Sequence, residues 1–147
     1  MSVAFHTEEV QFQLEQKRLH KQWISEWVHL HQKRPGNISF LFTSIEHIKL
    51  INQEYLNHNY FTDVITFDYS SGERISGDVF ISIDQLRINA NIYDVLIEDE
   101  QRRVMIHGVL HLMGFSDASD EEKVTMRKME NEALHLWLKL SQNDFRI

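Results

Sequence analysis

The chain has 147 residues, a formal net charge of −7 and no cysteine. Its length suits one domain over residues 1–147 with a sizeable core, and without cysteine the strong metal ligands left are His and carboxylate. No apolar run is long enough to cross a bilayer, and no basic segment followed by an apolar one opens the chain. We therefore expect a cytoplasmic protein with no membrane partner.

The first part of the chain alternates strand-like and helix-like patterns. Residues 2–13 alternate loosely and predict a short strand that leads into a helix. From about 15 to 33, apolar residues recur every three or four positions and predict an amphipathic helix. Its tryptophans, Trp23 and Trp27, are assigned to the core rather than to a base-stacking surface. The Pro-Gly pair at 35–36 is expected to end this helix and turn the chain.

A second strand and helix come next. Residues 37–42 (NISFLF) form a β-rich run. The S/T-x-x-E pattern at 43–46 is a capping box, and it predicts a helix that ends near Asn57. Residues 57–59 are expected to form a loop.

The second half predicts a hairpin and three helices. Strands are expected at 64–69 and 77–83, and the apolar residues on both faces of 77–83 place that strand inside the sheet. Asp84 is a candidate N-cap for a helix to about Leu96. A second capping box at 119–122 opens the last helix. The class predicted is α+β, with a small mixed sheet of about four strands covered by helices.

The stretch from His107 to Asp117, HGVLHLMGFSD, carries the chemistry. Two His residues four apart share one face of a helix, the spacing at which both imidazoles can bind one divalent metal. Gly114 is a helix stop, and the turn after it can deliver Asp117 as third ligand. Three protein ligands and an open position are typical of catalytic zinc. Two structural histidines, with Asp117 only capping a turn, remain the alternative.

This stretch resembles the HGxLHLxGYDH signature of the YbeY family, the endoribonucleases also described as rRNA maturation factors. Residues 51–67 (INQEYLNHNYFTDVITF) are similar to that family's LNxxYR…PTDVLSF segment, and residues 76–84 (SGDVFISID) to its GDIxIS strand. Together these segments cover about the last two thirds of the chain in family order. The resemblance implies a metalloprotease-like fold of about four strands, with the H-x-x-x-H helix packed centrally.

The chain departs from the family pattern at three positions. Asp117 stands where the family has a third His, Leu56 where it has an Arg after the Tyr, and Phe61 where it has the Pro before Thr-Asp. The family Arg is a group that can clamp a phosphate with two hydrogen bonds. A chain without it can be a slow nuclease, use another cation or act mainly in assembly.

A divalent metal with an open position can serve hydrolysis of a peptide or of a phosphodiester. Zinc proteases with this helix place a Glu after the first His as general base, and Gly108 stands there. A metallopeptidase is therefore disfavoured, unless Glu121, Glu122 or Asp78 supplies the base.

The family resemblance implies a metal-dependent, single-strand endoribonuclease in rRNA processing and ribosome maturation. Its partners would be small-subunit rRNA and ribosomal components, with no DNA expected. A metal-stabilised ribosome assembly factor with little nuclease activity is the alternative. Because the net charge is negative, RNA binding would rely on a local groove rather than on a basic surface.

Overall fold

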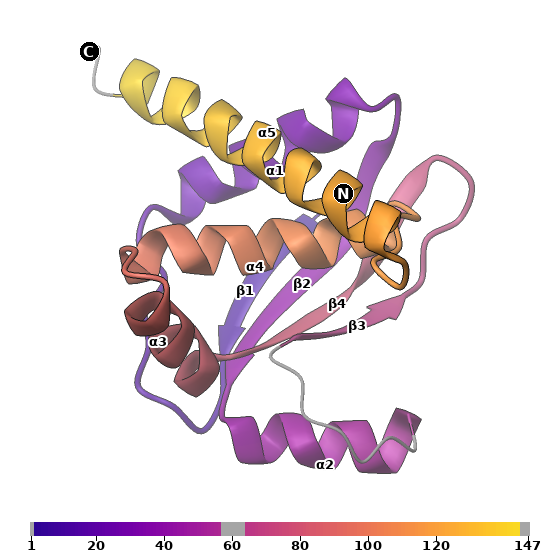
Figure 1. Cartoon of the computed structure of the whole chain (residues 1–147). Coiled ribbons are helices and arrows are strands. Elements are labelled where there is room, and N and C mark those ends of the chain that lie inside the picture. Colours follow the sequence, from indigo (N-terminus) through magenta and orange to yellow (C-terminus); the bar gives the residue numbers. More distant parts are fainter. Residues whose placement is uncertain (1, 57–63, 145–147) are drawn as a thin grey trace.

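The computed structural model describes residues 2–56 and 64–144, and the helices and strands in these ranges follow the predicted alternation (Figure 1). They are, in order, β1 (Ser2–Thr7), α1 (Lys17–Leu30), β2 (Arg34–Thr43), α2 (Ile45–Leu56), β3 (Val64–Asp68), β4 (Arg74–Ser82), α3 (Ile83–Ile92), α4 (Ile97–Leu112) and α5 (Asp120–Asp144). None of the helices in the described ranges has the length and apolar character that a bilayer crossing requires.

The four strands form one mixed sheet in the order β1-β2-β4-β3. β2 pairs in parallel with β1 and with β4, whereas β3 pairs antiparallel with β4. The hairpin predicted for the strands at 64–69 and 77–83 is confirmed by β3 and β4, in which Val64 lies opposite Ile81 and Thr66 opposite Val79. The interior position predicted for β4 is also confirmed, and so is the α+β class.

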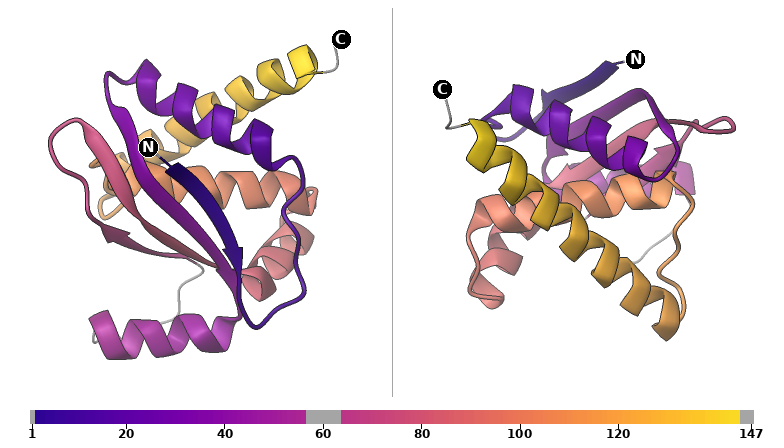
Figure 2. Two further views of the ribbon diagram at one scale, coloured as in Figure 1. Left: turned by 180° about the vertical axis from the view of Figure 1, so that it is seen from behind. Right: turned by 90° about the horizontal axis from the view of Figure 1, so that it is seen from above.

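Helices cover the two faces of the sheet unequally (Figures 1 and 2). α1, α4 and α5 lie on one face, where they share the main core cluster with buried residues of β1, β2 and β4. α2 lies on the other face over a smaller cluster that contains Ile48 and Ile65. The main core is therefore the layer between the sheet and the helices α1 and α4.

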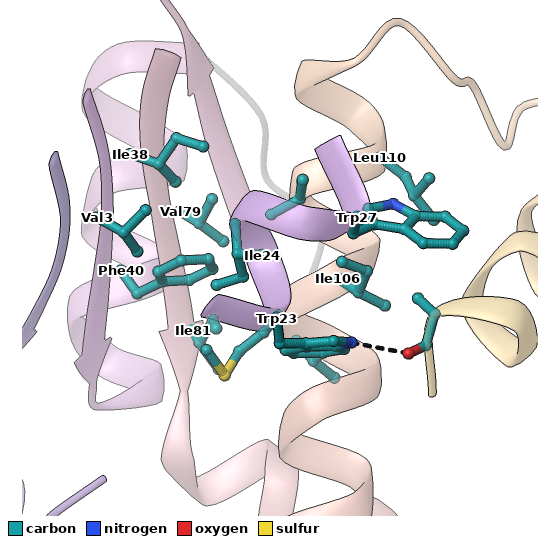
Figure 3. Close-up of a cluster of buried hydrophobic side chains, with 14 of the residues drawn as sticks. Val3, Trp23, Ile24, Trp27, Ile38, Phe40, Val79, Ile81, Ile106 and Leu110 are labelled. Carbon is teal, nitrogen blue, oxygen red and sulfur yellow. Dashed lines mark hydrogen bonds between the residues drawn. The ribbon is translucent and has the colours of Figure 1, made fainter. Parts of the chain in front are cut away.

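The aromatic stripe of α1 lies inside this core, as predicted (Figure 3). Trp23 and Trp27 are buried, and the Trp23 indole donates a hydrogen bond of 2.7 Å to the backbone carbonyl of Ala133 in α5. A buried indole N–H gains from such an acceptor because it cannot reach water, and Trp23 therefore ties α5 to α1. The indole N–H of Trp27 has no hydrogen-bond partner within the described part of the chain, so Trp27 contributes apolar packing. Neither tryptophan presents a surface for bases.

The role predicted for Pro35 and Gly36 is wrong. α1 ends at Leu30, and both residues lie inside β2, where the pairing with β4 shifts between Pro35 and Ile38. Proline is tolerated at such a strand irregularity because no ladder donor is needed there. A side chain at Gly36 would collide with Ser76, so the glycine allows β2 and β4 to approach.

Two of the predicted caps are also displaced. Ser82 is the N-cap of α3 and accepts a hydrogen bond from Gln85 N at 3.1 Å. Asp84 instead lies in the first turn of α3 and accepts from Ile45 N at 3.0 Å, which ties α3 to α2. At the start of α2, Ser44 Oγ accepts from His47 N at 3.2 Å, so the capping residue comes one position after the start of the predicted box.

Candidate metal centre

α4 brings His107 and His111 together on one face, as their spacing predicts. Their Nε2 atoms lie 3.1 Å apart, and the ring centroids are separated by 4.6 Å. Both side chains are half-buried, at 22% and 27% exposure. The two imidazoles therefore converge at their Nε2 atoms.

The end of α4 fixes the orientation of His111. Gly114 has φ of 98°, a conformation that glycine adopts without a Cβ penalty. Gly114 N donates to His111 O and Phe115 N donates to Leu110 O, each at 3.0 Å, the paired bonds of a Schellman motif. This turn places the Phe115 carbonyl 3.1 Å from Nδ1 of His111, where it accepts the ring proton. His111 therefore carries its lone pair on Nε2.

Asp117 completes the group. Its Oδ2 lies 3.3 Å from Nε2 of His107 and 3.5 Å from Nε2 of His111. These three side chains offer ligand atoms within 4.8 Å of one another and could hold a metal ion. Two donors about 2.0–2.1 Å from a tetrahedral zinc lie about 3.3–3.4 Å apart. The three observed separations of 3.1, 3.3 and 3.5 Å therefore fit one face of such a tetrahedron.

Glu130 of α5 fixes the orientation of His107. Its Oε2 lies 2.6 Å from Nδ1 of His107, and its Oε1 accepts from Arg103 at 3.0 Å. Since the carboxylate can only accept, Nδ1 of His107 donates and the ring lone pair lies on Nε2. A carboxylate behind a ligating His is the partner that fixes the ring orientation and raises its basicity.

The protonation states suit a cation. Burial raises the pKa of Glu130, but the hydrogen bonds from His107 and Arg103 outweigh it, so that its pKa lies below the ordinary value. Burial lowers the pKa of His111, and the neighbouring His107 lowers it further. An anionic Glu130 and a neutral His111 are therefore favoured near neutral pH, as metal ligation requires.

Sequence reasoning missed Glu130 and Arg103. Glu130 lies on the buried stripe of α5, four residues after Met126 and three before Ala133. A carboxylate at such a position needs a partner, because an unpaired buried charge is costly. That signal could have marked Glu130, although the periodicity of α5 alone does not say which groups it meets.

The position of the protease base has no room for a side chain. A Cβ at Gly108 would lie 2.6 Å from Cγ1 of Val79, since α4 packs closely on β4 there. Asp78 pairs with Phe67, which belongs to the cluster on the α2 face, so its side chain points away from α4. Glu122 is held by the capping box, which is confirmed by Ser119 N donating to its Oε1 at 3.0 Å.

A cleft of about 560 Å³ opens beside the histidines. Its floor is α4, and α3, β3 and α5 contribute walls; His107 and Asp117 line it. A ligand larger than water can therefore reach His107 and Asp117, two of the three converging side chains. Two of the positions at which the chain departs from the family pattern cannot be placed relative to this cleft. Phe61 lies outside the described residues, and so does the side chain of Leu56, the last residue of α2. The predicted loop at 57–59 also lies outside the described residues.

Comparisons with known proteins agree with this description. The family model described as Endoribonuclease YbeY matches residues 2–137. A protein of that name from Bacteroides thetaiotaomicron is 44% identical over 134 residues, which cover 91% of this chain and 98% of the relative. Another from Flavobacterium psychrophilum is 43% identical over 129 residues, covering 88% and 92%.

A solution structure of a Thermotoga maritima protein shares the fold. Its TM-score is 0.66 at 20% identity, and the alignment covers 98% of this chain and 94% of that one. The arrangement of the sheet and the helices is therefore found in a protein of distant sequence.

Proposed function

Because this chain belongs to the endoribonuclease YbeY family, we propose that it is a metal-dependent, single-strand endoribonuclease that acts in rRNA processing and ribosome maturation. Its substrate is the small-subunit rRNA, it works with ribosomal components, and its place is the cytoplasm. The observation that carries the proposal is the convergence of His107, His111 and Asp117 at the edge of an open cleft.

In this proposal His107, His111 and Asp117 hold one divalent ion, most simply zinc, since nitrogen and carboxylate ligands at these separations suit it. A bound divalent ion supplies Lewis-acid polarisation of a phosphoryl oxygen and makes water more acidic. An Asp ligand adds one negative charge, which weakens that Lewis acidity relative to three neutral His ligands.

The surrounding residues supply orientation. Glu130 and the Phe115 carbonyl hold the two rings with Nε2 toward the centre, so little rearrangement is needed when a cation binds. Gly108 leaves α4 against the sheet and offers no base for peptide hydrolysis. The cleft leaves a segment of RNA access to His107 and Asp117.

A cleavage assay tests the proposal. A labelled single-stranded RNA is incubated with the purified protein, with chelator-treated protein, and with treated protein to which zinc is returned. We expect cleavage that is lost with the chelator and restored by zinc. His111→Ala should abolish it, and His29→Ala, which changes an exposed histidine of α1, should not.

The other outcomes are equally informative. Cleavage that persists in chelator and in His111→Ala would contradict a metal-dependent nuclease. Absence of cleavage together with binding to small ribosomal subunits would support the assembly-factor alternative. Hydrolysis of a peptide substrate would overturn the assignment of the reaction.

A further inference from the structure

Two hollows meet at one residue of α5. The cleft at the metal centre includes Arg127 in its wall, and Arg127 also lines a second, shallower hollow of about 490 Å³. This second hollow follows one face of α5 and is lined by Val124, Arg127, Lys128, Asn131, Glu132 and His135. From Val124 to His135 it extends about 16 Å, at about 1.5 Å per helical residue. α5 crosses over α4 (Figure 2), so this path leads away from the metal centre.

The two arginines of the cleft differ in what holds them. Arg103 is only 25% exposed, and it donates to Glu130 at 3.0 Å and to Asn131 at 2.9 Å. Arg127 is 62% exposed, and its nearest charged partner is Glu130 at 3.8 Å. Glu130 is already bound by His107 and Arg103 at shorter distances. Arg127 therefore keeps its hydrogen-bonding fork available to a ligand.

Acidic and basic residues are unevenly distributed around the cleft. The end near α3 contains Asp99 and Glu100, and acidic groups there oppose an approaching phosphate. On the α5 side the exposed cations Arg127 and Lys128 are neighbours and line the second hollow, whereas Glu132, the acidic residue of that lining, lies about one turn farther along α5. A polyanion that reaches the metal centre therefore has its favourable route across α5 and not past α3.

Resting on the proposed function, we propose that the phosphodiester backbone of the single-stranded RNA substrate runs across α5, with Arg127 binding the phosphate next to the metal centre and Lys128 the following one. Guanidinium matches a phosphate with two parallel hydrogen bonds, and ammonium contacts it as a point charge. Arg127 is thus a phosphate-binding residue of the substrate path.

Binding of a short 2′-O-methyl RNA, followed by fluorescence anisotropy at several salt concentrations, tests this path without relying on cleavage. We expect Arg127→Ala to weaken binding by the metal-loaded protein about tenfold. The slope of log affinity against log salt should fall by about 0.7, since one phosphate contact is lost. Arg127→Lys should recover part of the affinity, and Lys128→Ala should lose less than Arg127→Ala.

Two matched controls define the direction of the path. Lys123→Ala removes an exposed charge of α5 that lines neither hollow, and Tyr93→Ala changes the α3 wall of the cleft. Both should bind RNA as the wild type does. Metal content and thermal midpoint should stay unchanged in Arg127→Ala, because a residue that only steadied Glu130 would alter them.

The results separate the two proposals. If the wild type neither binds nor cleaves RNA, the proposed function fails and the path fails with it. If the wild type binds RNA and Arg127→Ala binds equally well with the same salt slope, only the path is overturned. A larger loss in Tyr93→Ala than in Arg127→Ala would place the RNA along α3 instead.

Discussion

Two histidines of this protein, His20 on α1 and His107 on α4, have the same tautomer in two different surroundings. Nδ1 of His20 donates to the carbonyl of Gln16 at 3.0 Å, and Nδ1 of His107 donates to Glu130 at 2.6 Å. Each ring therefore has its lone pair on Nε2. What differs is the group that this lone pair meets.

Nε2 of His20 meets a donor, the side-chain amide of Gln101 at 3.3 Å, inside the core. Nε2 of His107 meets further acceptors, His111 and Asp117, beside an open cleft. A satisfied acceptor needs no cation, whereas converging acceptors are stabilised by one. A histidine is thus structural at position 20 and a candidate metal ligand at position 107.

Removing either of the two proposed ligand histidines, His107 or His111, should have the largest effect. We expect His107→Ala and His111→Ala each to abolish stoichiometric metal binding while the protein stays folded at moderate temperature. A site of three protein ligands is reduced to two by either change. Elemental analysis of the purified variants measures this, with circular dichroism as the check on folding. His20→Phe should keep the wild-type metal content. Unchanged zinc in both α4 variants would rule the site out.

Removing Asp117, the proposed third ligand, should have the next largest effect. Asp117→Ala should weaken metal affinity by more than about a hundredfold. Loss of a group that only supports a ligand costs up to about a hundredfold, and Asp117 is itself a proposed ligand. Asp117→His should retain the metal, because an imidazole can replace the carboxylate at the same turn. Competition with a chromophoric chelator gives both affinities. If Asp117→Ala binds zinc as tightly as the wild type, the third donor lies elsewhere.

Glu130 should have an intermediate effect. Glu130→Ala should lower metal affinity by about 10- to 100-fold, as loss of a partner behind a ligating His does. Glu130→Gln should lose less, because its amide oxygen still accepts from His107. Glu132→Ala, on an exposed position of the same helix, is the control.

Arg103→Ala tests whether Glu130 acts by orienting the His107 ring or only by linking α4 to α5. It removes one hydrogen bond to Glu130 and leaves the one to His107. Metal affinity should therefore fall less in Arg103→Ala than in Glu130→Ala. Equal losses in the two variants would make the role of Glu130 merely structural.

The sequence predicted the parts of this site that are local. His107 and His111 lie on α4, and Gly114 follows the end of this helix, so that residues 107–114 contain all three. The helical spacing and the positive φ of Gly114 therefore suffice to arrange them. Glu130 comes from the next helix, 23 residues after His107, and its place depends on how α5 packs over α4. The N-cap role predicted for Asp84 is wrong for a similar reason, since its hydrogen-bond partner Ile45 is 39 residues away in the sequence.

Protonation of His20 should destabilise the folded protein. Burial is the main reason that the pKa of His20 falls to about 4, the Gln16 carbonyl opposes the shift, and the nearby Arg102 adds to it. Because the folded state holds His20 neutral, its stabilising contribution is complete above the unfolded pKa of about 6.5 and is lost as pH falls toward 4. The loss reaches about 3 kcal/mol, at about 1.4 kcal/mol per pKa unit.

Urea unfolding at pH 7.5, 6 and 4.5 measures this loss of stability in chelator-treated protein, so that metal release does not contribute. His20→Phe, which places an apolar ring among Phe5, Trp23 and Trp137, should show a flatter dependence on pH over this range. A pH dependence equal to that of the wild type would mean that the proton is taken up elsewhere and that His20 is not held neutral by the core.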